Sequence, residues 1–541
     1  MRFQGALSDA ALANMARVHS AAHADTFGVV AVRGDAAEIV GHAMYSLLAD
    51  QRAEIAFAIA DDHQGRGLGT VLLGHLAEEA AARGVAIFEA SVLPHNHQMI
   101  AVFRDSGFDV HTRILPGEVR IEMPTEITPD AFARFEQRDW VGAVQAVSAL
   151  LQPKSVAVIG ASRHRGTIGG ETLHNLLSFG FTGPVFPVHP LAASVQGVLA
   201  YRDVEQIPEP VELAVIVVPA AHVLDVSRSC ARKGVKSLVV ISAGFGETGE
   251  AGRSLQQDLV DVCRASGMRL IGPNCMGILN TDPAIRLNAT FAPVIPPAGG
   301  LGIMSQSGAL GLALMEQAGA LGLGVSSFVS VGNKADLSGN DLIRYWHDDA
   351  ATNVILLYLE SFGNPRKFSR IARRVARAKP IIAVKSGRFA AGARATASHT
   401  GALVAASDVP VDALLRQSGV IRTNTLGEMF DAAALLACQP PPKGRRVAIL
   451  TNAGGPAILC ADACESEGLE LPELTTETRA ELARILPAAA TTTNPVDMIA
   501  SASIEQYREA VSILLRDPGI DSLVVIFIPP LATRASDIAR A

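Results

Sequence analysis

Two glycine-rich segments of this chain have residue types and spacing that suit a phosphorylated ligand. The first starts at Gln64, after an apolar stretch that reads as a strand and before one with helical spacing. The backbone N–H groups of such a turn point at one spot, and the start of the following helix adds positive potential. The segment therefore predicts a site for a pyrophosphate, formed by Gln64, Gly65, Arg66, Gly67, Leu68, Gly69 and Thr70. The alternative interpretation is a tight turn that binds no ligand.

The second segment starts at Gly160, directly after the apolar stretch Ser155–Ile159. Its glycines lack the G-x-G-x-x-G spacing of dinucleotide-binding turns, so the sequence does not favour NAD as its ligand. Four further motifs follow it in order, and they are Val188–Pro190, Gly272–Gly277, Ser305–Gly311 and Ser398–Leu403. This ordered series is the most specific signal in the chain.

The elements that must position these motifs alternate between strands and helices. We expect helices at Thr70–Arg83, Gln98–Ser106, Phe132–Leu151, Thr172–Phe179 and Gly308–Ala318. We expect early strands at Gly28–Val32, Glu38–Leu48, Glu54–Ile59 and Ala86–Val92. Later strands are expected at Ser155–Ile159, Val185–Val188, Leu213–Val218, Ser237–Ile241, Arg269–Ile271, Leu301–Ser305, Ser326–Val331, Val354–Leu359, Ile381–Lys385, Arg446–Thr451 and Leu523–Phe527. Such alternation predicts an α/β protein with doubly wound parallel sheets.

The length predicts several domains, because 541 residues exceed the roughly 100–200 residues of one domain. We expect a first domain over residues 1–122 and a linker over 123–150 that is mostly an amphipathic helix. Three further domains are expected over residues 151–285, 286–440 and 441–541. The last breaks off after the strand Leu523–Phe527 and therefore reads as truncated.

The composition excludes several classes of protein. A net charge of −7 argues against a general nucleic-acid binder, and no apolar run reaches the roughly 18–20 residues of a membrane span. The six cysteines form no C-x-x-C pair and have no histidines at zinc spacing, so we expect no metal site and a reducing cytoplasm. The basic run Arg370–Lys385 is expected to be a solvated helix face.

The first glycine-rich segment, followed by Asn96, Met99, Phe103 and Gly107, resembles the acetyl-CoA motif of the GNAT superfamily of N-acetyltransferases. The resemblance covers residues 1–122 and implies a GNAT fold that binds acetyl-CoA at Gln64–Thr70 and Asn96. Two departures stand out. The strand and helix that usually come before the family's first helix are missing, so the N-terminus is incomplete by comparison. Phe103 occupies a region where many relatives have a tyrosine as general acid.

In the branch of that family that acetylates protein lysines, a glutamate on the strand before the turn is the general base. Glu54 lies ten residues before Gln64, on the expected strand. The resemblance implies that Glu54 takes a proton from the lysine ammonium, directly or through a water. The alternative is a surface glutamate of a strand with no role in catalysis.

The second series resembles the ADP-forming acyl-CoA synthetases and the alpha subunit of succinyl-CoA synthetase over residues 150–440. The segment Thr451–Pro456 extends the resemblance to their third, flavodoxin-like domain. It implies a Rossmann-like CoA-binding domain followed by flavodoxin-like domains. The implied CoA-binding residues are Gly160, Ala161, Ser162, Gly166, Pro190, Pro273, Asn274 and Cys275.

The same resemblance implies that His399 becomes phosphorylated and that Glu360 orients it. The alternative for His399 is a loop histidine that caps a helix. A phosphohistidine is a dianion and needs helix N-termini with free N–H groups. Two such starts are expected, with phosphate-binding residues Ser305, Gln306, Ser307 and Gly308, and Asn452, Gly454 and Gly455. Lys334 is a candidate anion partner.

Three functions remain open. The leading hypothesis is a cytoplasmic N-acetyltransferase that moves acetyl from acetyl-CoA to a protein lysine, for example of an acyl-CoA synthetase, with the synthetase-like part as regulator or scaffold. The second is an ADP-forming acyl-CoA synthetase subunit that acts through phosphorylated His399. Since no ATP-grasp domain is found before Ala541, a separate ATP-grasp subunit would be its partner, and a homo-oligomer is also open. The third is a non-catalytic CoA sensor.

Overall fold

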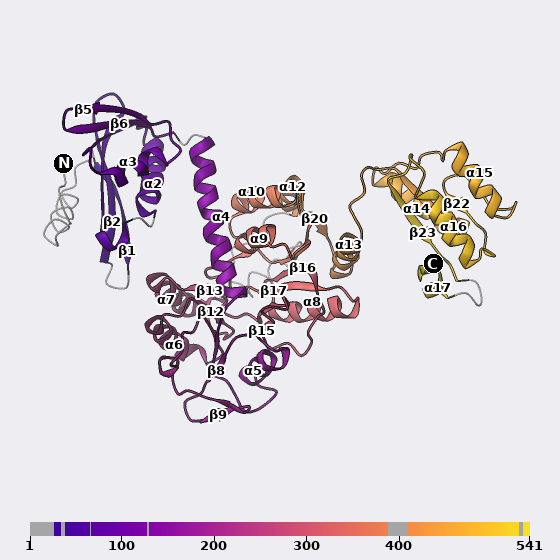
Figure 1. The fold of residues 1–541 in the computed structure, drawn as a ribbon, viewed down its shortest axis with the longest axis horizontal. Helices are drawn as coiled ribbons and strands as arrows, with labels where there is room; N and C mark the ends of the chain where they lie inside the picture. Colours follow the sequence, from indigo (N-terminus) through magenta and orange to yellow (C-terminus); the bar gives the residue numbers. More distant parts are fainter. Residues whose placement is uncertain are drawn as a thin grey trace. The chain divides into compact units, whose positions relative to one another are not determined.

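The computed structural model describes residues 26–33, 38–64, 67–126, 129–387, 408–529 and 534–540. The chain divides into two compact units, Met1–Ala437 and Cys438–Ala541. Strands and helices alternate through most of it, as Figure 1 shows, and the predicted mixed α/β class is confirmed.

The N-terminal sheet has the strand order β1-β2-β3-β4-β6-β5. Its strands are β1 (Thr26–Arg33), β2 (Glu38–Leu47), β3 (Arg52–Ile59), β4 (Ile87–Val92), β5 (His111–Leu115) and β6 (Glu118–Pro124). Only β3 and β4 run parallel, and they pair over Arg52–Glu54 alone, so the two strands part beyond Glu54. Apolar residues of α2 (Leu68–Ala82), such as Leu73 and Leu76, pack on this sheet, and α3 (His97–Arg104) follows β4.

The linker helix α4 (Pro129–Leu151) is confirmed as a helix, and it begins three residues before the expected Phe132. It packs against α9 (Gly339–Asp348). The Trp140 ring is buried, and its Nε1 donates a hydrogen bond to Asp348 Oδ2 at 2.9 Å. The side chains of Arg344 and Arg374 lie over the same ring, at 5.7 and 4.2 Å from its centroid.

The next sheet is wholly parallel, with the order β13-β12-β11-β7-β8. Its strands are β7 (Val156–Ile159), β8 (Val185–Val188), β11 (Leu213–Ile216), β12 (Ser237–Val240) and β13 (Arg269–Ile271). The helices that connect them are α5 (Ile168–Phe179), α6 (Ala220–Lys233) and α7 (Glu250–Ser266), and a short hairpin pairs β9 (Ser194–Val195) with β10 (Val198–Leu199). Buried strands of a parallel sheet read as continuous Val/Ile/Leu runs, which is why the sequence located them.

A second, mixed sheet has the order β15-β14-β17-β16-β18-β19-β20. Its strands are β14 (Gly277–Asn280), β15 (Leu287–Thr290), β16 (Ala298–Ser305), β17 (Val325–Ser330), β18 (Val354–Leu359), β19 (Ile381–Lys385) and β20 (Ile421–Thr423). Besides α9, its helices are α8 (Gly308–Ala320), α10 (Pro365–Val375), α12 (Asp408–Gln417) and α13 (Leu426–Cys438). The chain leaves β16 for β17 on one side and later adds β18 on the other. In such sheets the crevice at the carboxyl ends of these two strands is the usual ligand site.

The second unit contains a parallel sheet of order β22-β21-β23. Its elements are β21 (Val447–Thr451), α14 (Gly454–Ser466), α15 (Thr476–Ile485), β22 (Val496–Asp497), α16 (Ile504–Leu514), β23 (Ser522–Ile526) and α17 (Ala535–Arg540). Leu450, Leu482 and Tyr507 lie in its core.

Two expectations about local structure need correction. Helix α5 begins at Ile168, not at Thr172, because Thr167 caps it. The basic run Arg370–Lys385 is not a single helix face, since α10 ends at Val375 and β19 begins at Ile381. Within the described ranges, no helix is long and apolar enough to cross a membrane.

Candidate functional site

The loop between β7 and α5 is shaped by glycines that have no room for a side chain. A Cβ at Gly169 would lie 2.1 Å from the carbonyl oxygen of Gly160, and a Cβ at Gly170 would lie 2.0 Å from that of His164. Gly160 itself has φ 93°, a conformation that favours glycine. The start of α5 therefore lies directly against the end of β7, as a phosphate cradle requires.

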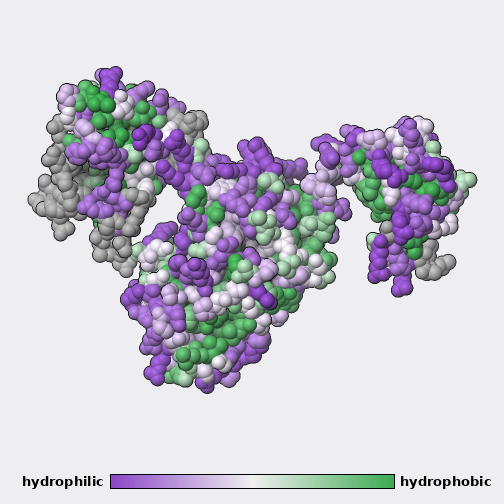
Figure 2. Space-filling model, in the orientation of Figure 1, coloured by the Kyte–Doolittle hydropathy of each residue, from purple (hydrophilic) through white to green (hydrophobic). Residues whose placement is uncertain are grey.

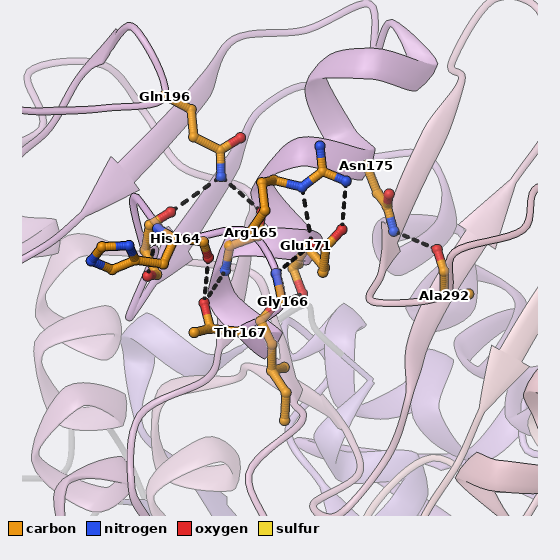
Figure 3. Close-up of polar contacts among 12 residues, drawn as sticks. His164, Arg165, Gly166, Thr167, Glu171, Asn175, Gln196 and Ala292 are labelled. Atoms are coloured by element: carbon orange, nitrogen blue, oxygen red, sulfur yellow. Dashed lines mark hydrogen bonds and ion pairs between the residues drawn. The ribbon is translucent and has the colours of Figure 1, made fainter.

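Side chains hold this loop in place (Figure 3). Arg165 makes a two-pronged ion pair with Glu171, at 2.9 and 2.8 Å, and Gly166 N donates to the same carboxylate at 2.6 Å. The Arg165 guanidinium and the Gly166 N–H lower the pKa of Glu171 to about 2. Gln196 Nε2 donates to Ser162 O at 3.1 Å and to Gly170 O at 2.8 Å, so the loop is fixed from both sides.

Apolar side chains are exposed beside this loop. Ile168 is 48% exposed and Leu191 is 88% exposed. Figure 2 shows hydrophobic residues gathered on the lower part of the molecule, over the region where Figure 1 labels β8, β9 and α5. Pro190, one of the predicted CoA-binding residues, is exposed next to Leu191. An apolar surface beside an anion cradle suits a ligand with a phosphate and a flat ring.

The segment Pro273–Cys275 follows β13 of the same sheet. Asn274 has φ 58°, and its backbone N–H donates to Ser242 O at 2.9 Å. Cys275 is buried, and its thiol donates to Val240 O at 3.3 Å. Burial raises the pKa of Cys275 to about 12, so this residue packs as a thiol and does not act as a thiolate.

The predicted phosphate-binding segment Ser305–Gly308 lies at the end of β16 and opens α8. Ser307 is the N-cap of this helix, and its hydroxyl accepts a hydrogen bond from Leu310 N at 3.4 Å. Ser305 Oγ donates to Ser307 O at 2.6 Å, which tightens the turn. This geometry is that of an anion site at a helix N-terminus.

Gln306 joins this turn to the end of β18. Its Oε1 accepts from Glu360 N at 2.7 Å and from Ser361 N at 2.9 Å, and its Nε2 donates to Ser361 O at 2.8 Å. The structure therefore brings together two predicted groups of the site, Ser305–Gly308 and Glu360, in the crevice between β16 and β18.

Lys334 reaches the same place from the loop after β17. Its Nζ donates to Ser361 O at 3.2 Å and also to Ser361 Oγ. Burial is the main cause that lowers the pKa of Lys334 to about 8; Lys385 lowers it further, and Glu360 opposes the shift. Burial thus makes Lys334 easier to deprotonate than an exposed lysine.

Asn452 and the start of α14 form the corresponding turn of the second unit. Asn452 Nδ2 donates to Ile528 O at 2.8 Å, and Asn452 Oδ1 accepts from Ile528 N at 2.9 Å. The helix begins at Gly454, and no side chain among the described residues caps it. Its first N–H groups are therefore available to an anion.

In the N-terminal domain, Gly67 has φ 81° and is the N-cap of α2. Gln64 Nε2 donates to Ile59 O at 3.1 Å and to Asp61 Oδ1 at 2.9 Å, whereas Asn96 caps α3 by accepting from Met99 N at 3.0 Å. Glu54 is exposed on β3, opposite Glu89 of β4.

Three predicted residues, Gly65, Arg66 and His399, lie outside the described residues. Sequence reasoning missed Ser361, which accepts hydrogen bonds from both Gln306 and Lys334. It also missed Asn333, whose Nδ2 donates to Glu247 Oε2 at 2.6 Å. Ser361 is not part of a motif, so no signal in the sequence pointed to it, whereas Asn333 lies in the segment Gly332–Asp336, from which only Lys334 was given a role. Among the residues with described positions, no group of histidine, cysteine and carboxylate side chains could hold a metal ion.

Four family descriptions match successive parts of the chain. The acetyltransferase (GNAT) family matches residues 6–108, and a CoA binding domain matches 154–281. A succinyl-CoA ligase like flavodoxin domain matches 298–436, and a ligase-CoA domain matches 447–540. The predicted fold classes, and the fusion of a GNAT domain to synthetase-like domains, are confirmed.

Whole proteins match over the synthetase-like part. The chain is 45% identical over 378 residues to the acetate–CoA ligase [ADP-forming] II subunit alpha of Pyrococcus furiosus, which covers 70% of this chain and 81% of that protein. The acetate–CoA ligase [ADP-forming] I subunit alpha of the same organism is 43% identical over 386 residues. That match covers 71% of this chain and 83% of that protein. The chain is also similar to a solved structure, that of the dinucleotide forming acetyl-coenzyme A synthetase 1 of Ca. Korarchaeum cryptofilum in complex with phosphate and ADP. The sequence identity is 38% and the TM-score is 0.70. The match covers 73% of this chain and 84% of that chain.

These matches correct the leading hypothesis. We expected transfer of acetyl to a protein lysine as the main function, with the synthetase-like part as regulator or scaffold. That expectation is wrong, because 70–71% of the chain matches the ligase subunits at 43–45% identity, over 81–83% of their length. The GNAT match concerns one domain alone. This chain belongs to the family of ADP-forming acetate–CoA ligase alpha subunits.

Proposed function

We propose that the chain is the alpha-type subunit of an ADP-forming acyl-CoA ligase. The overall reaction interconverts acyl-CoA, phosphate and ADP with a carboxylic acid, CoA and ATP. The observation that carries the proposal is the set of hydrogen bonds from Gln306, which joins the helix start at Ser305–Gly308 to Glu360. These bonds support the proposal, because transfer of phosphate through a histidine would need a helix N-terminus that can bind an anion and a carboxylate close to each other.

The chemistry has three steps. An oxygen of phosphate attacks the thioester carbonyl, the C–S bond breaks, and CoA leaves as a thiolate that takes up a proton; the product is an acyl phosphate. A ring nitrogen of His399 then attacks the phosphorus, the P–O bond to the acyl group breaks, and the carboxylate leaves. The phosphorylated histidine finally passes its phosphoryl group to ADP.

Each predicted group has a place in this scheme. The loop with Gly160, Ser162 and Gly166, supported by Asn274, would hold CoA. The N-terminus of α8 would bind the phosphate, and Glu360 would orient His399. The uncapped start of α14 at Gly454 is a second N-terminus that suits the phosphohistidine dianion.

The last step requires a partner. The names of the Pyrococcus furiosus relatives mark them as alpha subunits, which implies further subunits in those enzymes. We expect a separate ATP-grasp subunit to bind ADP and to receive the phosphoryl group. We also expect the GNAT domain to bind acetyl-CoA at Gln64–Thr70.

The experiment uses the full chain, acetyl-CoA and radiolabelled phosphate. The proposal predicts label on the protein that is stable in base, labile in acid and released when an ATP-grasp subunit and ADP are added. A Glu360→Gln variant should incorporate label at least about tenfold more slowly, because a lost hydrogen-bonded charge costs more than 1.4 kcal/mol. Labelling at an unchanged rate in that variant would remove Glu360 from the mechanism. Unlabelled wild-type protein would argue against the ligase function itself.

A further inference from the structure

Two adjacent side chains after β17, those of Asn333 and Lys334, form hydrogen bonds in different parts of the synthetase-like region. The amide of Asn333 bonds to residues that follow β12 of the parallel sheet, the sheet that carries the predicted CoA-binding residues. The ammonium group of Lys334 bonds instead to Ser361, in the crevice between β16 and β18. One peptide unit therefore links the CoA-binding sheet to the crevice.

Every polar group of the Asn333 side chain has a partner. Its Nδ2 donates to Glu247 Oε2 at 2.6 Å and to Gln256 Oε1 at 2.9 Å. Its Oδ1 accepts from Asn274 Nδ2 at 3.4 Å, and its backbone N–H donates to Pro273 O at 3.0 Å. These bonds form a connected network, which fixes the side chain and the backbone of Asn333 together.

Glu247, the partner in the shortest of these bonds, is itself held firmly. Its Oε1 accepts from Gly244 N at 2.6 Å and from Phe245 N at 3.1 Å. Burial raises the pKa of Glu247, but the hydrogen bonds from Asn333 and from Gly244 outweigh this effect, so the pKa is lowered and the carboxylate is charged at neutral pH. The bond from Asn333 is thus charge-assisted, which makes it one of the stronger kinds of hydrogen bond.

The backbone of Lys334 has a conformation that is unusual for a residue other than glycine, with φ 55°. Such a residue keeps this conformation only where its surroundings require it. On one side, Gly332 packs so closely that an added Cβ would lie 2.3 Å from Pro273 O, and on the other Asp336 accepts from Arg269 Nε at 2.8 Å. The bonds of Asn333 complete these constraints directly next to Lys334.

This conformation brings Lys334 to the turn that we expect to bind phosphate. Ser361 O accepts both from Lys334 Nζ at 3.2 Å and from Gln306 Nε2 at 2.8 Å, so the ammonium group lies close to the Gln306 amide. An ammonium group has three donors, and Ser361 O and Oγ occupy two of them. The third donor suits an oxyanion at the start of α8.

We propose that Asn333 is a positioning residue for anion binding in the crevice. Held by Glu247, it keeps Lys334 in the conformation from which the ammonium group binds the phosphate substrate. Asn333 acts through Lys334 and not by contact with the substrate. The inference rests on the proposed ligase function, since that function makes inorganic phosphate a substrate in this crevice.

A double-mutant cycle on sulfate binding tests whether Asn333 acts through Lys334. Sulfate replaces phosphate because it keeps a single charge state near neutral pH, and calorimetric titration of the full chain measures its affinity. We expect Asn333→Ala, Lys334→Gln and the double variant each to bind sulfate about tenfold more weakly than the wild type, because without Lys334 there is nothing for Asn333 to position. Gln257→Ala removes an exposed amide next to Gln256 and is the matched control, with unchanged affinity.

Two results would overturn the positioning role. The first is a double variant that binds about a hundredfold more weakly, as independent effects would give. The second is an Asn333→Ala variant with a lowered urea midpoint and unchanged sulfate affinity, which is the result for a residue that serves the fold alone.

A second variant covers the case in which Asn333→Ala does not fold. Asn333→Asp has nearly the same shape but turns the donor that faces Glu247 into an acceptor, so sulfate affinity should fall as in Asn333→Ala. Addition of Glu247→Gln restores a donor–acceptor pair with the same net charge and should recover the affinity. Failure to recover in a folded protein would refute Glu247 as the residue that holds Asn333.

Phosphate labelling separates this inference from the proposed function. In Asn333→Ala, the phosphate concentration for half-maximal labelling should rise about tenfold, with little change in the maximal rate. Labelling with an unchanged dependence on phosphate keeps the ligase function and refutes the positioning role. The expected sulfate cycle in a wild-type protein that is never labelled refutes the ligase function and keeps the role of Asn333 in anion binding.

Discussion

The loop after β7 and the crevice between β16 and β18 are both suited to anions, but different forces hold them. In the loop, backbone packs on backbone, and a Cβ at Gly169 would lie 2.1 Å from the carbonyl oxygen of Gly160. In the crevice, side chains span the gap, since Gln306 and Lys334 both bond to Ser361. We conclude that substitutions in the loop damage the fold first, whereas substitutions in the crevice damage the function first.

The largest expected effect comes from Gly169→Ala. The added methyl group cannot fit against Gly160, so the start of α5 must move, at a cost of about 3 kcal/mol or more. Urea unfolding of the unit that contains it should shift to lower concentration, and CoA binding should be lost. Gly142→Ala in α4, a helix of the same unit, is the control, because among the described residues nothing lies within 4 Å of its added Cβ. Equal stability of the two variants would contradict the distinction between loop and crevice.

Gln306→Ala should have the opposite profile. It removes hydrogen bonds to Glu360 N, Ser361 N and Ser361 O, so the ends of β16 and β18 lose their link. We expect phosphate labelling to slow at least about tenfold, with a loss of stability of about 1–3 kcal/mol. Labelling kinetics and urea unfolding measure the two effects. If the variant is strongly destabilised but its folded fraction is still labelled rapidly, Gln306 serves the fold and not the reaction, contrary to our conclusion.

Gly67→Ala tests the glycine turn of the N-terminal domain, where the reason for glycine is conformational. Gly67 has φ 81°, and among the residues that the structure describes nothing lies within 4 Å of an added Cβ. We expect a loss of about 1 kcal/mol from the strained backbone, which is less than at Gly169. Thermal unfolding of the variant checks this ranking. A loss as large as that of Gly169→Ala would show that contacts matter in this turn as well.

The pH dependence of anion binding should separate the two regions further. Lys334 is charged below its pKa of about 8, so anion affinity in the crevice should fall as pH rises through that value. Glu360 favours the charged form of Lys334, and Lys385 opposes it. Lys367 also lines a cavity of about 220 Å³ at this crevice. Titration of sulfate binding from pH 6 to 10 would detect the fall, and Lys334→Gln should abolish it. A flat profile in the wild type would contradict a role for Lys334.

The smallest effect is expected for Glu171→Gln in the loop. The carboxylate has its pKa lowered to about 2 by Arg165 and Gly166, so its contribution to stability is complete above pH 4.5 and is lost as pH falls toward 2. The pair is partly exposed, and such pairs contribute little. Thermal midpoints at pH 7 and pH 3 should differ less in the variant than in the wild type. An equal difference would exclude Glu171 as a source of acid sensitivity.

The sequence located the strands best where they are buried. Val354–Leu359 and Ile381–Lys385 have the predicted bounds, because continuous apolar runs mark buried parallel strands. The first residues of helices were harder to predict, as α5 shows. Its start depends on the local hydrogen bond by which Thr167 caps it, and the spacing of apolar residues does not indicate such a bond. Helix α9 carries Asn340 and was not predicted.

The site was predictable in its motifs but not in its connections. Ser305–Gly308 and Glu360 were both expected, yet the bonds that join them link residues 54 and 55 positions apart. The cavity at this crevice was not predicted, because its residues come from β18, α9, α10 and the loops after β16, β17 and β18, without a shared motif. The roles of Glu54 and Asn96, and the five-part division of the chain, stay predictions.

The most direct test of the account is to find where phosphate is attached. The full chain would be treated with acetyl-CoA and phosphate, digested without acid and analysed by mass spectrometry, with phosphorus NMR on the intact protein. We predict one phosphoramidate, at His399, that is absent from a His399→Asn variant. A phosphate on another residue, or none in a protein that still converts acetyl-CoA to acetate and CoA, would contradict the phosphohistidine mechanism.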